Sequence, residues 1–289
     1  MSSYPAVWKS PAKLNLFLHV TSKREDGYHN LETLFQFINL FDEIEIEKTL
    51  DGSIKRISGN ETIPESSDIM IKAAHLLKNS ASKEMGCEIK IRKQIPMGGG
   101  LGGGSSNAAT ILIALNHLWN LNLSKDQLKS IALELGADVP IFIEGRNSLA
   151  TGVGENLFPV ELDDDFYFVV LNIKKNVSTQ EIFSHEALTF TTATEKIPDL
   201  LKKTSRRNDC LHAAIETEPE IARALEYLNS QNSIFEEAQM TGTGSSVFAR
   251  FDNKKGALDA VKNLPPEWEA FVTQPINYSP LYDWAVAKR

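Results

Sequence analysis

The residues of this chain best suited to chemistry form a glycine-rich run at residues 96–109, which reads Pro-Met-Gly-Gly-Gly-Leu-Gly-Gly-Gly-Ser-Ser-Asn-Ala-Ala. Glycine adopts positive φ angles and lets the backbone come close to a ligand, so consecutive N–H groups can converge on it. A helix that begins directly after the run adds unpaired N–H groups and the positive end of its dipole. The run therefore predicts an anion site, and phosphate is the ligand that suits such a site best.

The segments on either side of the glycine run support this interpretation. Residues 87–93 alternate between apolar and charged side chains, as a strand with one buried face does. Ser105 opens a Ser-Ser-Asn stretch, and these residue types favour a helix N-cap. Apolar residues then recur at helical spacing: Ala108, Leu112, Leu115 and Trp119. We expect a strand, a glycine loop and a helix, in that order.

Other known types of glycine-rich motif require features that this run lacks. A P-loop requires a lysine after the last glycine, where this chain has Ser105. A dinucleotide fingerprint is met formally by Gly98, Gly100 and Gly103, but it also needs an acidic residue about 20 residues further on, after a second strand. The chain continues there with a further helical pattern. A flexible linker is also not expected here, because the run lies directly between a strand and an amphipathic helix with no stretch of polar residues separating it from them.

The run resembles the central motif of the GHMP kinases, a family of small-molecule kinases. Pro-Ala-Lys-Leu-Asn-Leu at residues 11–16 and Thr-Gly-Thr-Gly-Ser-Ser-Val-Phe-Ala at residues 241–249 resemble the other two motifs of the family, in the right order. Three shorter segments are most similar to members that act on a cytidyl-bearing alcohol: Gly-Tyr-His at 27–29, Leu-Gly-Ala-Asp-Val-Pro at 135–140 and Asn-Asp-Cys at 208–210. The resemblance covers residues 11–251 and implies two α+β domains with the active site in the cleft between them.

Lys13 and Asp138 are the catalytic residues that the resemblance implies. Strand alternation places Lys13 and Asn15 on a polar face, opposite leucines that must be core. Taken alone, such a lysine is more simply a solvated charge, and an aspartate after Gly136 a turn former. The family's first motif places this lysine beside the acceptor hydroxyl, with Asn15 binding the same substrate, while Asp138 accepts the hydroxyl proton. A neighbouring lysine cation would keep Asp138 ionised.

The resemblance also implies that ATP binds with Mg²⁺ at the glycine run. The expected ATP-binding residues are Pro96, Met97, Gly98, Gly99, Gly100, Leu101, Gly102, Gly103, Gly104, Ser105 and Ser106. Without a P-loop lysine, backbone N–H groups must meet much of the charge on the transferring phosphoryl group. The hydroxyls of Ser105 and Ser106 contact a phosphate or the metal, or act as N-caps, and the sequence leaves both roles open.

The expected acceptor site is built from aromatic and polar residues far from the glycine run: Asn15, Tyr28, His29, Phe183, Thr241 and Gly242. A pyrimidine stacks on aromatic rings, and its edge needs hydrogen-bond partners. The family's Gly-Tyr-His segment lies at its cytidine pocket, although an aromatic beside a histidine is also common in core packing. Residues 241–244 form either a loop over the site or a simple hairpin turn. Ser-Asp-Ile at residues 67–69 departs from the Asp-Asn-Leu often found on the adenine side.

Composition agrees with a folded cytoplasmic enzyme. The chain has 289 residues, of which 42% are hydrophobic and 24% charged, and its net charge of −8 argues against a nucleic-acid surface. Two cysteines cannot form a disulfide framework, and no Cys/His cluster has zinc-ligand spacing. Residues 1–9 lack an apolar signal segment, and the longest strongly apolar run, residues 166–171, is too short to span a bilayer. We expect small-molecule partners only, no membrane, and a monomer or homodimer.

Helix and strand patterns alternate irregularly, which favours α+β layers over a doubly wound sheet. Strands are expected at 13–20, 43–47 and 166–171, and helices at 68–78, 208–216, 220–228 and 255–263. A further helix starts at Ser124, where Gln127 completes a capping box, and stops at Gly136. Because the order of elements restarts near residue 160, we expect an N-terminal domain of residues 1–160, with Lys13 and Asp138, and a C-terminal domain of residues 161–289.

The function that the resemblance implies is ATP-dependent phosphorylation of the 2-hydroxyl of a cytidyl-bearing alcohol in non-mevalonate isoprenoid precursor synthesis. One alternative is another small-molecule kinase of the same family, of the homoserine or mevalonate type, which the Tyr28-His29 segment opposes. The other is a nucleotide-binding sensor without catalysis, which the presence of Lys13 and Asp138 opposes.

Overall fold

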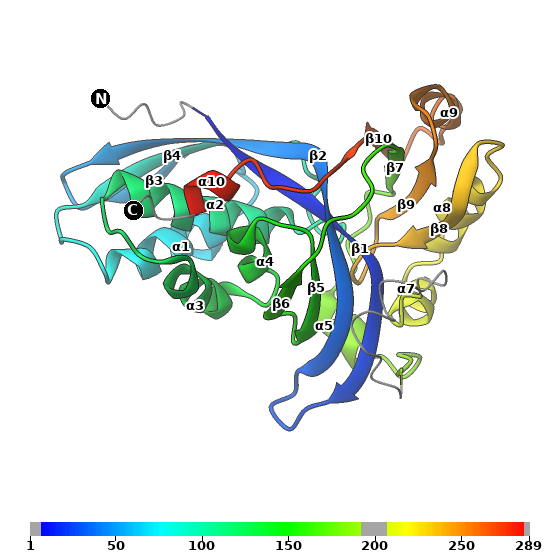
Figure 1. Cartoon of the computed structure of the whole chain (residues 1–289), viewed down its shortest axis with the longest axis horizontal. Coiled ribbons are helices and arrows are strands. Elements are labelled where there is room, and N and C mark those ends of the chain that lie inside the picture. Colours follow the sequence, from blue (N-terminus) through cyan, green and yellow to red (C-terminus); the bar gives the residue numbers. More distant parts are fainter. Residues whose placement is uncertain (1–6, 192–206, 286–289) are drawn as a thin grey trace.

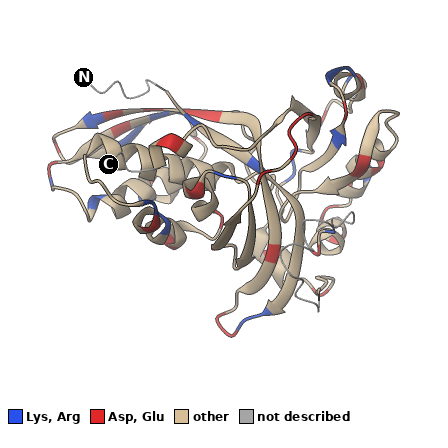
Figure 2. Ribbon diagram, in the orientation of Figure 1, with Lys and Arg blue, Asp and Glu red and all other residues tan. Residues whose placement is uncertain are grey.

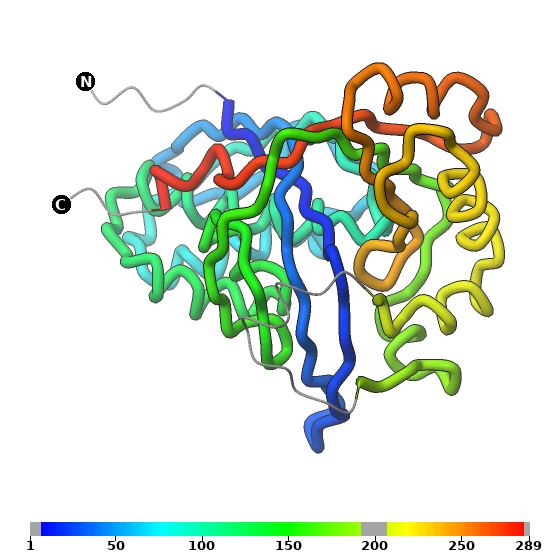
Figure 3. The backbone as a smooth tube through the Cα atoms, turned by 45° about the vertical axis from the view of Figure 1, so that its right-hand side comes forward, coloured from blue at the N-terminus to red at the C-terminus, as the bar shows by residue number. Residues whose placement is uncertain are grey.

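The computed structural model describes residues 7–191 and 207–285; most of the amino-terminal segment in which no signal was expected lies outside this part. The described chain forms two β-sheets, and the first of them contains a long antiparallel pair, β1 (Trp8–Lys23) and β2 (His29–Thr49). Figure 1 shows this pair projecting as a hairpin, and Figure 3 shows it running between the two halves. The expected two-domain α+β architecture is confirmed.

The first half is a seven-stranded sheet with helices packed on it. Its strand order is β3-β4-β2-β5-β6, and β1 and β11 pair with β2. The further strands are β3 (Ile54–Ser58), β4 (Gly86–Arg92), β5 (Ser148–Gly152), β6 (Asn156–Pro159) and β11 (Pro275–Ile276). The helices are η1 (Glu65–Ser67), α1 (Ile69–Lys78), α2 (Gly103–Leu118), α3 (Lys125–Leu135) and α4 (Val139–Glu144). Apolar residues of α1 and α2 share one core with those of β2 and β4.

The second half is a four-stranded antiparallel sheet in the order β10-β7-β9-β8. Its strands are β7 (Tyr167–Asn172), β8 (Ile234–Met240), β9 (Val247–Phe251) and β10 (Glu269–Thr273). Its helices are α5 (Thr179–Ser184), α7 (Leu211–Thr217), α8 (Glu220–Asn229) and α9 (Lys254–Ala260). A separate apolar cluster, with Leu14 and Phe17 of β1 and Phe168 and Phe248 of the second sheet, connects the two halves.

Local sequence explains where the helices next to the glycine run begin and end. Ser124 accepts from the N–H of Gln127, the capping box is complete, and Gly136 ends α3 as expected. The helix after the glycine run begins at Gly103, two residues earlier than the sequence pattern indicates, and its N-cap is Gly102 with φ +72°. The N-cap role considered for Ser105 and Ser106 is therefore wrong, because both lie inside α2.

The end of the described chain returns to the first half. After β10, strand β11 pairs with β2, and α10 (Tyr282–Ala285) contacts α2 and α4. Figure 3 shows this red segment crossing back over the blue strands. Trp284 packs edge-on against Trp8 of β1, with ring centroids 5.3 Å apart. The division into residues 1–160 and 161–289 stays a prediction, and the first sheet includes this short strand from beyond it.

Charge and thiol placement agree with the compositional argument. Figure 2 shows Lys and Arg positions scattered among Asp and Glu positions on the same elements. Within the described ranges, no helix has both the length and the apolar character needed to cross a membrane. The two cysteines are free and buried, Cys87 in the core of the first half and Cys210 in that of the second. Burial raises the pKa of each thiol to about 12.

Candidate active site

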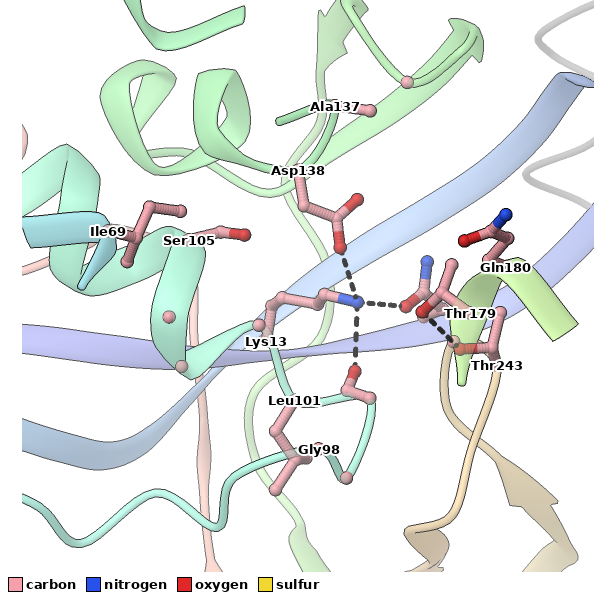
Figure 4. Close-up of a pocket in the computed structure, with 18 of the residues that line it drawn as sticks. Lys13, Ile69, Gly98, Leu101, Ser105, Ala137, Asp138, Thr179, Gln180 and Thr243 are labelled. Carbon is pink, nitrogen blue, oxygen red and sulfur yellow. Dashed lines mark hydrogen bonds and ion pairs between the residues drawn. The ribbon is translucent and has the colours of Figure 1, made fainter. Parts of the chain in front are cut away.

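A cavity of about 1000 Å³ lies where the two halves meet. The glycine loop, Lys13 and Asp138 line its middle, and Figure 4 shows Ile69 and Ser105 on one side of this centre and Thr179, Gln180 and Thr243 on the other. The side of Ile69, which we call the α1 end, is also lined by Asn60, Ile63, Ser67, Asp68 and Met70. The tip of the β1–β2 hairpin and α5 line the opposite side, which we call the hairpin end.

The glycine loop needs its glycines because of both dihedral angles and space. Gly98, Gly100 and Gly102 have φ of +69°, +74° and +72°, a region that residues with a Cβ rarely adopt. A Cβ on Gly100 would lie 2.2 Å from the carbonyl oxygen of Thr241, and one on Gly102 would lie 2.8 Å from the ring of Phe142. The loop is therefore packed directly against the segment at 241–244 and against Phe142, and its residues line the cavity.

Lys13 is the buried cation at the centre of the cavity. Its side chain is only 2% exposed, and its Nζ lies 3.3 Å from a carboxylate oxygen of Asp138. The same ammonium donates to Asn15 Oδ1 at 2.5 Å and to the carbonyl oxygen of Gly100 at 3.0 Å, as the dashed lines in Figure 4 show. The alternative of a solvated surface charge is excluded for this lysine, because three oxygen atoms fix its position.

Asp138 is held between two helices. Helix α3 ends at Gly136, α4 starts at Val139, and Asp138 occupies the N-cap position without using its side chain as a cap. The carboxylate is therefore free to face Lys13. Unlike the lysine, the Asp138 side chain is 41% exposed, so it is accessible to a ligand in the cavity.

The hairpin end of the cavity carries the aromatic residues expected for the acceptor. His29 stacks on Phe183 of α5, with centroids 5.2 Å apart and an interplanar angle of 22°. Tyr28, at the hairpin tip, is 62% exposed, so its ring is accessible. Burial lowers the pKa of His29 below its usual 6.5, and the ammonium of Lys23 adds to this effect. The imidazole is therefore neutral at pH 7 and can exchange hydrogen bonds with an uncharged ligand edge.

Most of the expected site residues line the cavity, including residues 96–105, Asn15 and Gly242. Ser106 and Thr241 do not lie on its wall. Both are fully buried behind it: the hydroxyl of Ser106 accepts from that of Ser10, and the hydroxyl of Thr241 accepts from the N–H of Asn15 at 2.9 Å. Ser106 and Thr241 therefore make structural contacts, and of the two adjacent serines only Ser105 lines the cavity.

Several residues of the cavity wall were not expected from the sequence. Thr179 and Thr243 approach each other from α5 and the segment at 241–244, with hydroxyl oxygens 3.1 Å apart. Thr179 lies one helical turn before Phe183, and that i, i+4 spacing could have indicated it. Asn208, in the Asn-Asp-Cys segment, donates to the carbonyl oxygens of Met240 and Gly242 and so holds the loop from behind.

An ion pair holds residues 67–69, the segment that departs from the family pattern. Asp68 is 1% exposed, caps α1 by accepting from the N–H of Met70, and pairs with the guanidinium of Arg56. Arg56 also donates to the carbonyl oxygen of Ile63 at 2.8 Å. The negative charge of Asp68 is thus paired inside the protein, and the wall at the α1 end is held in place.

Comparisons with known proteins agree with this geometry. Residues 68–146 match the model of the GHMP kinases N terminal domain. A solved structure of mevalonate kinase is similar with a TM-score of 0.64 at 15% identity, covering 94% of this chain and 100% of that one, which shows the shared fold alone. The crystal structure of 4-(cytidine 5'-diphospho)-2C-methyl-D-erythritol kinase is more similar, with a TM-score of 0.78 at 30% identity over 93% of this chain and 98% of that chain.

The fold is that of a GHMP kinase. The relative from Ruthia magnifica subsp. Calyptogena magnifica, named 4-diphosphocytidyl-2-C-methyl-D-erythritol kinase, is 48% identical over 98% of this chain and 99% of its own length. The relative of the same name from Cupriavidus taiwanensis is 45% identical over 96% and 94%. This chain belongs to the 4-diphosphocytidyl-2-C-methyl-D-erythritol kinase family. Membership in a kinase family implies ATP as the phosphoryl donor.

Proposed function

We propose that this chain transfers the γ-phosphoryl group of ATP to the 2-hydroxyl of 4-diphosphocytidyl-2-C-methyl-D-erythritol, giving the 2-phosphate and ADP, as a step of non-mevalonate isoprenoid precursor synthesis. The observation that carries the proposal is the Lys13–Asp138 pair, 3.3 Å apart, between a glycine loop and an aromatic recess in one cavity. The names of relatives at 48% and 45% identity support the choice of acceptor.

In this proposal the nucleotide enters from the α1 end. The triphosphate lies on the glycine loop and the start of α2, where backbone N–H groups and the helix dipole attract it. Its γ-phosphate must reach Lys13 and Asp138, so the adenine base would lie against the wall at the α1 end, which includes apolar Ile63 and Ile69. Ser105 supplies a hydroxyl to a phosphate or to the metal.

Mg²⁺ fits this site as an ion carried largely by the nucleotide. Among the residues that the structure describes, no group of three or more His, Cys, Asp or Glu side chains is arranged to hold a metal. Magnesium keeps several waters and binds substrate phosphates with few protein ligands, so a dedicated cage is not required. Ser105 would be its protein contact, and the ion would neutralise charge on the phosphates.

At the hairpin end, the acceptor would place its cytosine among Tyr28, His29 and Phe183 and its hydroxyl at Asp138. The hydroxyl oxygen forms the new bond to phosphorus as the bond to the ADP oxygen breaks, and Asp138 takes the hydroxyl proton. The transition state of phosphoryl transfer is loose, so the carboxylate chiefly aligns the hydroxyl. Lys13 stabilises the developing negative charge without moving, because Asn15 and the Gly100 carbonyl fix it.

The decisive experiment is a coupled assay of ADP release from the purified full chain with three acceptors. We expect turnover with 4-diphosphocytidyl-2-C-methyl-D-erythritol and none above background with homoserine or mevalonate. Preference for one of the latter would assign the chain to another small-molecule kinase. Tight ATP binding without turnover on any acceptor would indicate a sensor instead.

We further propose a cytoplasmic protein, a monomer or homodimer, built from domains 1–160 and 161–289 as expected above. The interleaved charges support small-molecule partners over nucleic acid. Light scattering of the purified chain distinguishes the two oligomeric states.

A further inference from the structure

Asp42 of β2 is a fully buried carboxylate that does not touch the cavity. One of its oxygens accepts from the backbone N–H groups of Gln94 at 2.7 Å and Ile95 at 2.9 Å, the two residues that lead into the glycine run. The other oxygen accepts from Asn107 Nδ2 at 2.9 Å and pairs with the ammonium of Lys93. Four donors on one carboxylate compensate the cost of burying its charge.

Two of these donors belong to side chains that line the cavity. Lys93 and Asn107 both form part of its wall, and Lys93 Nζ also donates to Asn107 Oδ1 at 3.1 Å. The ammonium lies next to the first turn of α2, because a Cβ built on Gly103 would be 3.4 Å from it. A cation is thus held beside the helix start on which the nucleotide is placed.

The contacts continue into the neighbouring strand and helix. Asn107 Nδ2 also donates to the hydroxyl of Ser10 at 2.9 Å, and that hydroxyl donates to Ser106 at 2.8 Å. Ser10 and Asp42 are cross-strand partners in the register of β1 and β2. One carboxylate therefore connects both long strands, the entry of the glycine loop and the first turn of α2.

We infer that Asp42 is a positioning residue for the nucleotide: it holds the Lys93 ammonium and the entry of the glycine loop in the geometry that binds ATP. The inference rests on the proposed placement of ATP at the α1 end. Asp42 acts through Lys93 and Asn107 and touches no substrate itself. Its loss therefore weakens binding of the nucleotide and leaves binding of the acceptor at the hairpin end unchanged.

A double-mutant cycle between Asp42 and Lys93 tests the inference. Asp42→Asn keeps an oxygen for Gln94 and Ile95 but turns an amide donor toward Lys93 and Asn107. We expect Asp42→Asn to raise the KM for ATP about tenfold and to change the KM for the acceptor less than twofold. Lys93→Met should raise the KM for ATP similarly. In the Lys93→Met background, adding Asp42→Asn should change it less than twofold, because the ammonium that Asp42 positions is gone.

Glu144→Gln is the matched control. Glu144 is also a buried carboxylate, with three cations, Lys125, Lys129 and Arg146, within 3.5 Å, but neither it nor these partners line the cavity. This variant should lower the melting temperature without changing the KM for ATP. If Asp42→Asn does not fold, Asp42→Glu, which retains the charge, replaces it in the same cycle with the same expectation.

The possible outcomes separate this inference from the proposed function. Equal effects of the Asp42 change in both backgrounds, or equal rises in both KM values, would show a general structural brace and overturn the inference alone. An unchanged KM for ATP in Lys93→Met would contradict the placement of the nucleotide, and the positioning role with it. A rise in the KM for ATP in Glu144→Gln would also overturn the inference, since any lost buried pair would then have the same effect.

Discussion

Lys13 and Asp138 differ in how firmly the protein holds them. Three oxygen atoms surround the buried ammonium of Lys13, while the side chain of Asp138 is 41% exposed. A fixed cation stabilises charge without reorganising, and an accessible carboxylate can receive a hydroxyl. The asymmetry matches the roles proposed for the two residues.

Asp138→Asn is expected to reduce turnover about 100-fold or more while ATP binding remains, because the amide still fills the space but cannot take the proton. Turnover is measured by ADP release and binding by calorimetry. Asp126→Asn is the control, since that aspartate is 90% exposed on α3 and does not line the cavity. Near-normal turnover of Asp138→Asn would remove Asp138 from the proposed role.

The acceptor KM should depend on pH through His29. Burial and Lys23 keep its pKa below 6.5, so the imidazole is neutral above that pH and the KM should be flat there. As the pH falls through the lowered pKa, the ring gains a proton that its surroundings disfavour, and the acceptor KM should rise. The KM for ATP over the same range, and a His29→Gln variant, are the controls. A rise that persists in His29→Gln would have another origin.

At the scale of elements, the glycine loop depends on backbone conformation more than on side chains. Gly102→Ala would strain a φ of +72° and bring a Cβ within 2.8 Å of Phe142 and 3.1 Å of Lys13. We expect turnover to fall at least tenfold because Lys13 is displaced. Gly145→Ala has nearly the same φ, +71°, with no contact closer than 3.3 Å and no place in the cavity.

The Gly145→Ala variant should lose about 1 kcal/mol of unfolding free energy to the left-handed conformation and keep its turnover. Comparing the two alanine variants by denaturant unfolding and by ADP release separates strain from displacement of the catalytic lysine. Equal losses of turnover would attribute the effect to instability alone.

The sequence predicted these elements well wherever a local rule applies. The capping box at Ser124, the stop at Gly136 and the strand carrying Lys13 all follow from spacing and residue type. Ser106 shows the limit, because a serine after glycines looks the same whether its hydroxyl faces a ligand or Ser10. Ser105 lines the cavity and Ser106 contacts Ser10, although the two are neighbours in one helical turn. Which of them faces the cavity depends on the residue at which α2 begins.

At the scale of the whole molecule, the returning C-terminal segment should contribute stability to the first half. Trp284→Ala removes ring contacts with Trp8 at 5.3 Å and His117 at 5.4 Å, and we expect a loss of about 2 kcal/mol, less than for a fully buried tryptophan. Phe235→Ala, at a residue that is 56% exposed, is the control and should lose less. Denaturant titration measures both, and equal losses would contradict a stabilising return.

Sequence patterns could not predict tertiary contacts between segments far apart in the chain. The pairing of β11 with β2 joins residues more than two hundred positions apart, and two residues of strand carry no periodicity. Likewise, Asp42 reads as one more charge next to an alternating strand, and only the fold brings Lys93 and Asn107 to it. The resemblance identified the three family motifs, whereas these connections between them required coordinates.

Each half of the protein contains one buried thiol, and the reactivity of that thiol reports how often the core of that half opens. A thiol reagent can reach Cys87 only when the first core opens and Cys210 only when the second does, so two labelling rates measure two local free energies. Because the cluster around Phe17 and Phe168 spans both sheets, the two rates should be similar. A nucleotide and an acceptor bound between the halves should slow both together, which would make cysteine labelling a binding assay that needs no turnover.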